Sequence, residues 1–211
     1  MLDTRTLYKL LYEHMGPQGW WPAESKIEIM IGAILVQNTN WRNAAYAIES
    51  LKTATQLDPH HILSLRLETL QEVIKSSGFY KNKAQTILSL LTWLNHYSYN
   101  YQAVKAHYKQ NLRRALLNIK GVGSETADVL LVYIFEAVEF IPDSYTRRIY
   151  RKLGYTQTES YEKLKRRIEL PSEFTNQDAN EFHALLDNFG KNYFNGKEMD
   201  KFTFLDPYFE I

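Results

Sequence analysis

The sequence predicts an all-α protein of about ten helices. Apolar side chains recur at three- and four-residue spacing in one segment after another, which is the period of a helix with one buried face. Capping residues, glycine and proline separate these segments, and no stretch shows a convincing strand alternation of apolar and polar residues. With 211 residues, 45% of them hydrophobic, the chain can bury a substantial core.

Composition excludes several classes of site. There is no cysteine, so disulfides, thiolate catalysis, cysteine-ligated zinc and an iron–sulfur cluster with its usual ligands are all excluded. The adjacent pair His60-His61 has the wrong spacing for a helical metal pair, and we expect no metal and no other cofactor. The net charge is +1, so any contact with a polyanion must be built locally.

The first helix is expected from Leu2 to Met15, where Gly16-Pro17 ends it. Ser25 and Glu28 form a capping-box pattern before a strongly apolar helix. Asp58 followed by Pro59 predicts the start of a short helix, with a capping acid and a proline at its first position. Further helices in this half are expected from about Trp41 to Ala54, from Leu67 to Ser76, and from the Gly78 turn through Leu94.

Two segments between these helices have more than one reading. Trp20-Trp21, before Pro22, can plug the junction of two packed units, or at least one indole can line a pocket for a flat ligand. Gln37 and Asn38 begin a polar run before Trp41, which can be an ordinary capped loop or a set of amides that probe an opened base pair.

The stretch from Leu116 to Asp143 holds the strongest signal. Gly121-Val122-Gly123 predicts a tight hairpin that opens a helix, and such a turn exposes successive backbone N–H groups to a phosphate oxygen. The basic pair Arg113-Arg114 precedes it, which is a solvated face or a phosphate contact. Pro142-Asp143 then places a carboxylate directly before another helix.

The C-terminal part predicts three more helices and a folded-back tail. Basic residues mark the helices from Ser144 to Leu153 and from Tyr161 to Ile168, and we read these first as solvated faces. The third helix runs from Asn176 to Phe194, with aromatic and leucine side chains at helical spacing.

The hairpin and the following aspartate resemble the helix-hairpin-helix-GPD signature of the endonuclease III superfamily of base-excision DNA glycosylases. The likeness rests on Leu117, the Gly121-Val122-Gly123 turn, Thr126, Ala127, Asp143 and the run from Gly32 to Thr39. The resemblance implies two all-α lobes. One is a helical barrel over residues 22–138 with the helix-hairpin-helix at about 110–136, and the other combines residues 1–21 with 139–211.

Two departures from the family pattern restrict the resemblance to one branch of the superfamily. Glu125 occupies the position of the lysine that forms a Schiff base in bifunctional members, and a carboxylate cannot form an imine. The cysteines of the endonuclease III cluster are absent. The chain therefore looks most like the cluster-free 3-methyladenine DNA glycosylase III branch, also called endonuclease III-related, and we expect no AP-lyase activity.

The resemblance assigns roles to particular residues. Asp143 is expected to be the catalytic carboxylate and to cap its helix as well, with a capping role alone as the alternative. The alternative for Glu125 is a first-turn acid that complements the helix dipole. The expected base-pocket residues are Trp21, Pro22, Trp41, Glu125 and Lys197. For Lys197 taken alone, a solvated lysine is favoured over a pocket residue. The expected DNA-binding residues are Gln37, Asn38, Lys120, Gly121, Val122, Gly123, Ser124 and Thr126.

These residues predict a monomeric, metal-independent enzyme that acts on double-stranded DNA. It is expected to remove alkylated purines such as 3-methyladenine after base flipping. No segment reads as a signal peptide or a membrane span, so we expect a cytoplasmic location, with the nucleoid as its place in a bacterium. Two alternatives stay open: a glycosylase for a mispaired or damaged pyrimidine, and a catalytically silent helix-hairpin-helix DNA-binding protein.

Overall fold

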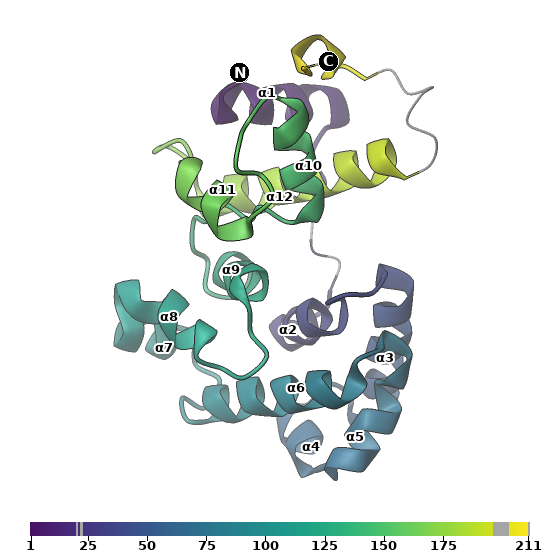
Figure 1. Cartoon of the computed structure of the whole chain (residues 1–211). Helices are drawn as coiled ribbons and strands as arrows, with labels where there is room; N and C mark the ends of the chain where they lie inside the picture. Colours follow the sequence, from purple (N-terminus) through teal and green to yellow (C-terminus); the bar gives the residue numbers. More distant parts are fainter. Residues whose placement is uncertain (20, 22, 196–202, 211) are drawn as a thin grey trace. The chain divides into compact units, whose positions relative to one another are not determined.

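The all-α prediction is confirmed. A computed structural model describes residues 1–19, 21, 23–195 and 203–210, and over these residues it contains only helices, turns and loops (Figure 1). The chain divides into two compact units. The first unit combines Met1–Pro22 with Glu136–Ile211, and the second unit is the continuous segment Ala23–Phe135. The bounds of the second unit differ from the expected 22–138 by one residue at the start and three at the end.

The second unit is built around α2 (Lys26–Leu35), which packs against α3, α6 and α9. Its apolar side chains from Met30 to Leu35 are buried, as the sequence predicts for a core helix. The other helices of this unit are α3 (Trp41–Thr55), α4 (Pro59–Ser64), α5 (Leu67–Val73), α6 (Tyr80–Asn95), α7 (Tyr101–Tyr108), α8 (Leu112–Leu117) and α9 (Ser124–Tyr133), with 3-10 turns at Lys75–Ser77 and Lys109–Asn111.

Capping side chains set several helix starts where the sequence predicts them. Asn40 caps α3 through the N–H of Asn43, and the carboxylate of Asp58 accepts from two N–H groups in the first turn of α4. The capping box of α2 is only half formed. The hydroxyl of Ser25 accepts the N–H of Glu28, but the carboxylate of Glu28 accepts the N–H of Glu24 rather than that of Ser25.

The two arms of the hairpin, α8 and α9, are joined by a buried ion pair. The Nε of Arg113 lies 2.8 Å from Oδ1 of Asp128, and its Nη2 lies 3.2 Å from Oδ2. The side chain of Asp128 is fully buried. Arg113, one member of the basic pair Arg113-Arg114, therefore has a structural role inside the hairpin that does not require a phosphate.

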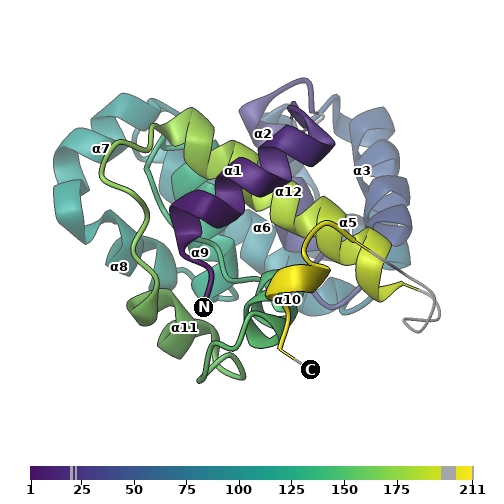
Figure 2. The ribbon, with the colours of Figure 1, turned by 90° about the horizontal axis from the view of Figure 1, so that it is seen from above.

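The first unit is organised by α12 (Asn176–Phe194), whose bounds match the expected helix. It packs against α1 (Thr4–Met15) and α10 (Ser144–Lys152), and Figure 2 shows α1 crossing over it. Leu7, Leu11, Phe182 and Leu185 belong to the buried core of this unit. The remaining helices are α11 (Tyr161–Arg167) and a 3-10 turn at Asp206–Tyr208.

The helix expected from Leu67 to Ser76 is shorter than the sequence suggests. The segment expected as Leu67–Ser76 ends as α5 at Val73 and continues as a 3-10 turn, because the Ser77 hydroxyl bonds the Ile74 carbonyl as the chain approaches Gly78. Within the described ranges, no helix has the length and apolarity that crossing a membrane requires.

Candidate active site

Asp143 caps α10. Its backbone is extended, with φ −60° and ψ −178°, and its Oδ1 accepts the N–H of Thr146 at 2.7 Å. The capping role considered from the sequence is therefore confirmed. The side chain is only 7% exposed, and a carboxylate that serves only as a cap has no need to be so deeply buried. Burial of an acid requires further compensation inside the protein.

His183 supplies that compensation from α12. Its Nε2 lies 3.2 Å from Oδ2 of Asp143, and both side chains are nearly inaccessible. Burial raises the pKa of Asp143, but the hydrogen bond and charge of His183 and the N–H of Thr146 lower it by more, so the pKa lies below its ordinary value. The carboxylate is therefore ionised at neutral pH.

A glycine allows the two helices that carry this pair to approach closely. A Cβ atom added to Gly190 of α12 would lie 2.4 Å from the Cβ of Tyr145 in the first turn of α10. Such a separation is far inside van der Waals contact, so only glycine fits between these backbones. The close packing brings the N-terminus of α10 to the middle of α12, where His183 lies.

The same helix anchors the loop that leads to Trp21. The backbone N–H of Gln18 donates to the carboxylate of Glu181, and the amide of Asn188 donates to Oε1 of Gln18 at 2.6 Å. Trp21, three residues later, is half-buried. Within the first unit, α12 thus fixes both Asp143 and the start of the tryptophan loop. Pro22 and Lys197 lie outside the described residues.

The hairpin in the second unit packs closely against α6 at Gly121. Gly121 has φ +86°, and a Cβ there would lie 1.8 Å from Oγ1 of Thr86 on α6. The N–H of Val122 is used inside the turn, because it donates to the Ile119 carbonyl at 3.0 Å, and the Val122 side chain is buried. The expected series of exposed N–H groups is therefore interrupted at Val122.

The donors left for an anion belong to the two glycines. The N–H groups of Gly121 and Gly123 make no hydrogen bond within the part of the chain that the structure describes. Gly123 is the N-cap of α9, so its N–H lies at the positive end of that helix. Lys120 beside them is exposed, and Ser124 begins α9. This arrangement suits a phosphate group.

Gln37 ties the end of α2 to the hairpin. Its amide donates to Oγ1 of Thr126 at 2.7 Å and approaches the carbonyl of Gly121 at 3.5 Å. Thr126 is buried, so its hydroxyl serves this contact. Asn38, the next residue, is exposed and has φ +52°, a backbone conformation that asparagine tolerates better than most residues.

The other predicted pocket residues of the second unit lie at helix starts. Trp41 is the first residue of α3 and is 38% exposed. Glu125 is an exposed acid in the first turn of α9. Each is therefore accessible on the surface of its own unit.

Several polar residues with structural roles were not predicted from the sequence. His183, Asp187 and Lys191 follow one another at four-residue spacing in α12, and this i, i+4 spacing, which places ionisable side chains on one face of a helix, is the signal that could have identified them. Lys83 is 2% exposed, and its ammonium donates to the carbonyls of Leu35 at 2.8 Å and of Ser77 at 2.6 Å. It joins the end of α2 to the turn before Gly78.

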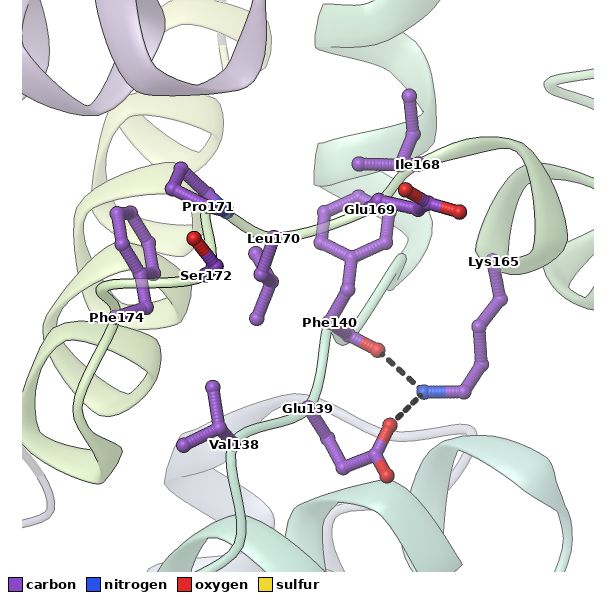
Figure 3. A pocket seen from close by; sticks show the side chains of 10 residues that line it. All are labelled: Val138, Glu139, Phe140, Lys165, Ile168, Glu169, Leu170, Pro171, Ser172 and Phe174. Atoms are coloured by element: carbon purple, nitrogen blue, oxygen red, sulfur yellow. Dashed lines mark hydrogen bonds and ion pairs between the residues drawn. The ribbon is translucent and has the colours of Figure 1, made fainter.

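A separate pocket of about 520 Å³ lies in the first unit, between the segment that precedes α10 and the segment that joins α11 to α12 (Figure 3). Lys165 crosses one side of it, donating to the carboxylate of Glu139 at 2.7 Å and to the carbonyl of Phe140 at 2.9 Å. Its apolar wall is formed by Val138, Phe140, Ile168, Leu170, Pro171 and Phe174. Of the residues predicted to bind a base, the three that the structure describes, Trp21, Trp41 and Glu125, do not line this pocket.

Comparison with known families identifies the chain. The model of the HhH-GPD superfamily of base excision DNA repair proteins matches residues 31–173. The chain belongs to this superfamily. It is a base excision repair DNA glycosylase by family, and the matched span contains both the hairpin and Asp143. His183 lies beyond that span.

Individual relatives agree with this assignment. The chain is 36% identical over 185 residues to MJ1434, a candidate DNA repair glycosylase of Methanocaldococcus jannaschii, covering 85% of this chain and 83% of the relative. It is 28% identical to endonuclease III of Sulfolobus acidocaldarius, covering 74% and 69%. The fold is similar to that of H. pylori 3-methyladenine DNA glycosylase (MagIII) bound to 1,N6-ethenoadenine, with a TM-score of 0.75, 26% identity and coverage of 90% and 98%. A trapped endonuclease III–DNA covalent intermediate has the same fold, with a TM-score of 0.71, 21% identity and coverage of 93% and 90%.

Proposed function

We propose that this protein is a monofunctional DNA glycosylase that removes alkylated purines, such as 3-methyladenine, from double-stranded DNA. The reacting sugar carbon cannot be reached inside a duplex, so the damaged nucleotide must first be rotated out of the stack. The observation that carries the proposal is the buried carboxylate of Asp143, held ionised at the N-terminus of α10 by His183 and Thr146.

Asp143 is proposed to act on the sugar. The N-glycosidic bond breaks with its electron pair leaving on the base, so a cationic methylated purine departs neutral. The sugar gains oxocarbenium character, which a nearby carboxylate stabilises. Water then adds to the sugar carbon and releases one proton. No covalent enzyme intermediate is required.

The hairpin is proposed to hold the DNA backbone. The N–H groups of Gly121 and Gly123 and the exposed Lys120 offer a phosphate three donors in one short turn. Gln37 and Asn38 lie at the end of α2, beside the hairpin, and are proposed to contact the bases near the damaged site. Val122 and Thr126 are proposed to contribute indirectly, by fixing the shape of the turn.

The preference for alkylated purines rests on two observations. The structurally similar H. pylori enzyme is a 3-methyladenine DNA glycosylase bound to a modified adenine. Glu125 is exposed in the first turn of α9 and adds a negative charge that favours a cationic base. Trp21 and Trp41 are proposed to stack on the extrahelical base, and a stacked cation is worth roughly 0.5–2 kcal/mol.

A second candidate is a glycosylase for damaged or mispaired pyrimidines, because several relatives are named endonuclease III. Release of 3-methyladenine and 7-methylguanine should be compared with cleavage of duplexes that contain uracil or thymine glycol. Preferential release of the two methylated purines supports the proposal, whereas preferential action on the pyrimidine lesions would select the second candidate.

The role of Asp143 is tested by Asp143→Asn, which keeps the capping oxygen but removes the charge. Base release should fall by at least about a hundredfold, while binding to the damaged duplex is retained. Release at the wild-type rate would refute the proposed mechanism, and a wild-type protein that binds but never releases a base would be the silent DNA-binding protein.

The monofunctional assignment is tested by borohydride trapping. Because Glu125 cannot form an imine, the wild type should give no covalent adduct with DNA, while an endonuclease III treated in parallel does. A robust adduct would show that a lysine elsewhere, such as Lys120, acts as a nucleophile.

A further inference from the structure

His183 is placed where it can control the proposed catalytic carboxylate. The two carboxylate oxygens of Asp143 have different partners: Oδ1 accepts the Thr146 N–H at 2.7 Å, and Oδ2 lies 3.2 Å from Nε2 of His183. An ionised carboxylate can only accept hydrogen bonds, so Nε2 of His183 carries the hydrogen. The imidazole is therefore the donor that fixes the second oxygen.

The surroundings of this pair come from both packed helices. On α12, Asp187 and Lys191 follow His183 at four-residue spacing, and Lys191 pairs with the Asp187 carboxylate. Burial and the negative charge of Asp143 raise the pKa of Asp187, and Lys191 and His183 lower it by less. On α10, Arg147 donates to the Glu159 carbonyl. The charges of Asp187 and Lys191 on α12 thus act on the Asp143–His183 pair, whereas the contact of Arg147 is to a carbonyl further along the chain.

Removal of His183 would shift the equilibrium between the ionised and the protonated forms of Asp143. Burial alone disfavours the ionised carboxylate, and the Thr146 N–H would remain as its donor from the main chain. The pKa of Asp143 would then rise, so that a larger fraction of the carboxyl group would be protonated in mildly acidic solution. A protonated Asp143 cannot stabilise a developing positive charge on the sugar.

We propose that His183 is a positioning residue for base excision, whose Nε2–H holds the Asp143 carboxylate in its orientation and in its ionised form. The proposal rests on the proposed function of Asp143. With both oxygens engaged by donors, the carboxylate is a weak base and acts by its charge. The proton released by the attacking water then goes to solvent. His183 itself does not touch the sugar or the base in this role.

The experiment measures single-turnover base release as a function of pH, with enzyme in excess over the best duplex substrate of the comparison above. Three variants are compared with the wild type: His183→Leu, which removes the donor, His183→Gln, whose amide can replace Nε2–H, and His14→Leu, an exposed histidine on α1 in the same unit. Thermal unfolding of each variant establishes that it is folded.

We expect the wild-type rate to be independent of pH down to about pH 5, because the pKa of Asp143 is low. In H183L the acidic limb of the pH–rate profile should shift to higher pH by about one to two units, since a hydrogen bond to a charged group is lost. At a pH within the shifted limb, its rate should fall at least about tenfold below that of the wild type. H183Q should restore most of the wild-type profile, and H14L should match the wild type.

Two results would overturn the proposal. One is an H183L profile with the wild-type shape, whether its rate is unchanged or uniformly lower, because a purely structural role scales the rate at every pH alike. The other is an H183Q profile that matches that of H183L. The proposed function is judged separately by Asp143→Asn: if that variant retains release, the assignment of Asp143 fails, whereas its inactivity with an unshifted H183L profile refutes only the role of His183.

Discussion

Replacement of Gly121 by alanine should test how the hairpin is held. Two costs can be estimated from the structure. The backbone has φ +86°, and a left-handed conformation costs an L-residue about 1–2 kcal/mol. The new Cβ would also lie 1.8 Å from Oγ1 and 3.0 Å from Cβ of Thr86, and overpacking of this kind costs about 1–3 kcal/mol. Thr86 is buried, so it cannot turn outward to make room.

The expected loss of stability is therefore about 2–5 kcal/mol. For a chain of this size, a loss of about 3 kcal/mol corresponds to a decrease in Tm of roughly 6–12 °C. Circular dichroism during heating measures Tm, and urea unfolding gives the free-energy change. Hydrogen exchange should localise the loss to α6 and the hairpin.

Gly123→Ala is the matched control. This glycine has φ −90°, and an added Cβ would meet no atom within 4 Å. Its Tm should stay close to that of the wild type. Thr86→Ala in the G121A background should recover the steric part, about 1–3 kcal/mol, and leave the backbone part. Equal stability of G121A and G123A would refute the close packing of Gly121 on α6.

Two further substitutions probe the helix packing around each site. Gly190→Ala improves helix propensity by about 1 kcal/mol, but its Cβ would collide with Tyr145. We therefore expect a lower Tm, and slower single-turnover base release because Asp143 and His183 are forced apart. A higher Tm would contradict the close approach of α10 and α12. Lys83→Met leaves two buried carbonyls without a donor and should cost about 2–4 kcal/mol in urea unfolding, whereas Lys81→Met, exposed on the same helix, should cost almost nothing. Burial lowers the pKa of Lys83 from 10.5 to about 8, so between these two pH values the unfolded state binds more protons than the folded state. The wild type should therefore gain stability relative to K83M as the pH rises from about 8 to 10.5. A stability difference that falls with rising pH would contradict this.

The elements that depend on local sequence could be predicted well. The start of α4 follows from Asp58-Pro59, and α12 has the expected bounds, because capping and apolar periodicity are properties of neighbouring residues. The N-cap position of Asp143 is of the same kind and is confirmed. Its catalytic role stays a proposal.

The electrostatic environment of the site could not be predicted in the same way. His183 lies 40 positions after Asp143 in the sequence, and only the packing of α10 on α12, which Gly190 permits, brings their side chains together. The hydrogen bond from the Val122 N–H to the Ile119 carbonyl makes this N–H unavailable to a phosphate, and it likewise depends on the backbone geometry of one turn. The sequence Gly-Val-Gly does not determine that geometry. Long-range partners and turn geometry are tertiary properties, and helix periodicity carries no information about them.

The discontinuous first unit imposes an order on folding during synthesis. Helix α1 ends at Met15, and its packing partner α12 ends at Phe194, 179 residues later. At about 5–20 residues per second, a ribosome needs roughly 9–36 s to cover that interval. Throughout it, Leu7 and Leu11 have no core to enter, whereas the continuous second unit can already fold as it emerges. The apolar face of α1 therefore stays exposed on the nascent chain until α12 has been made, which makes α1 the segment on which a chaperone would act.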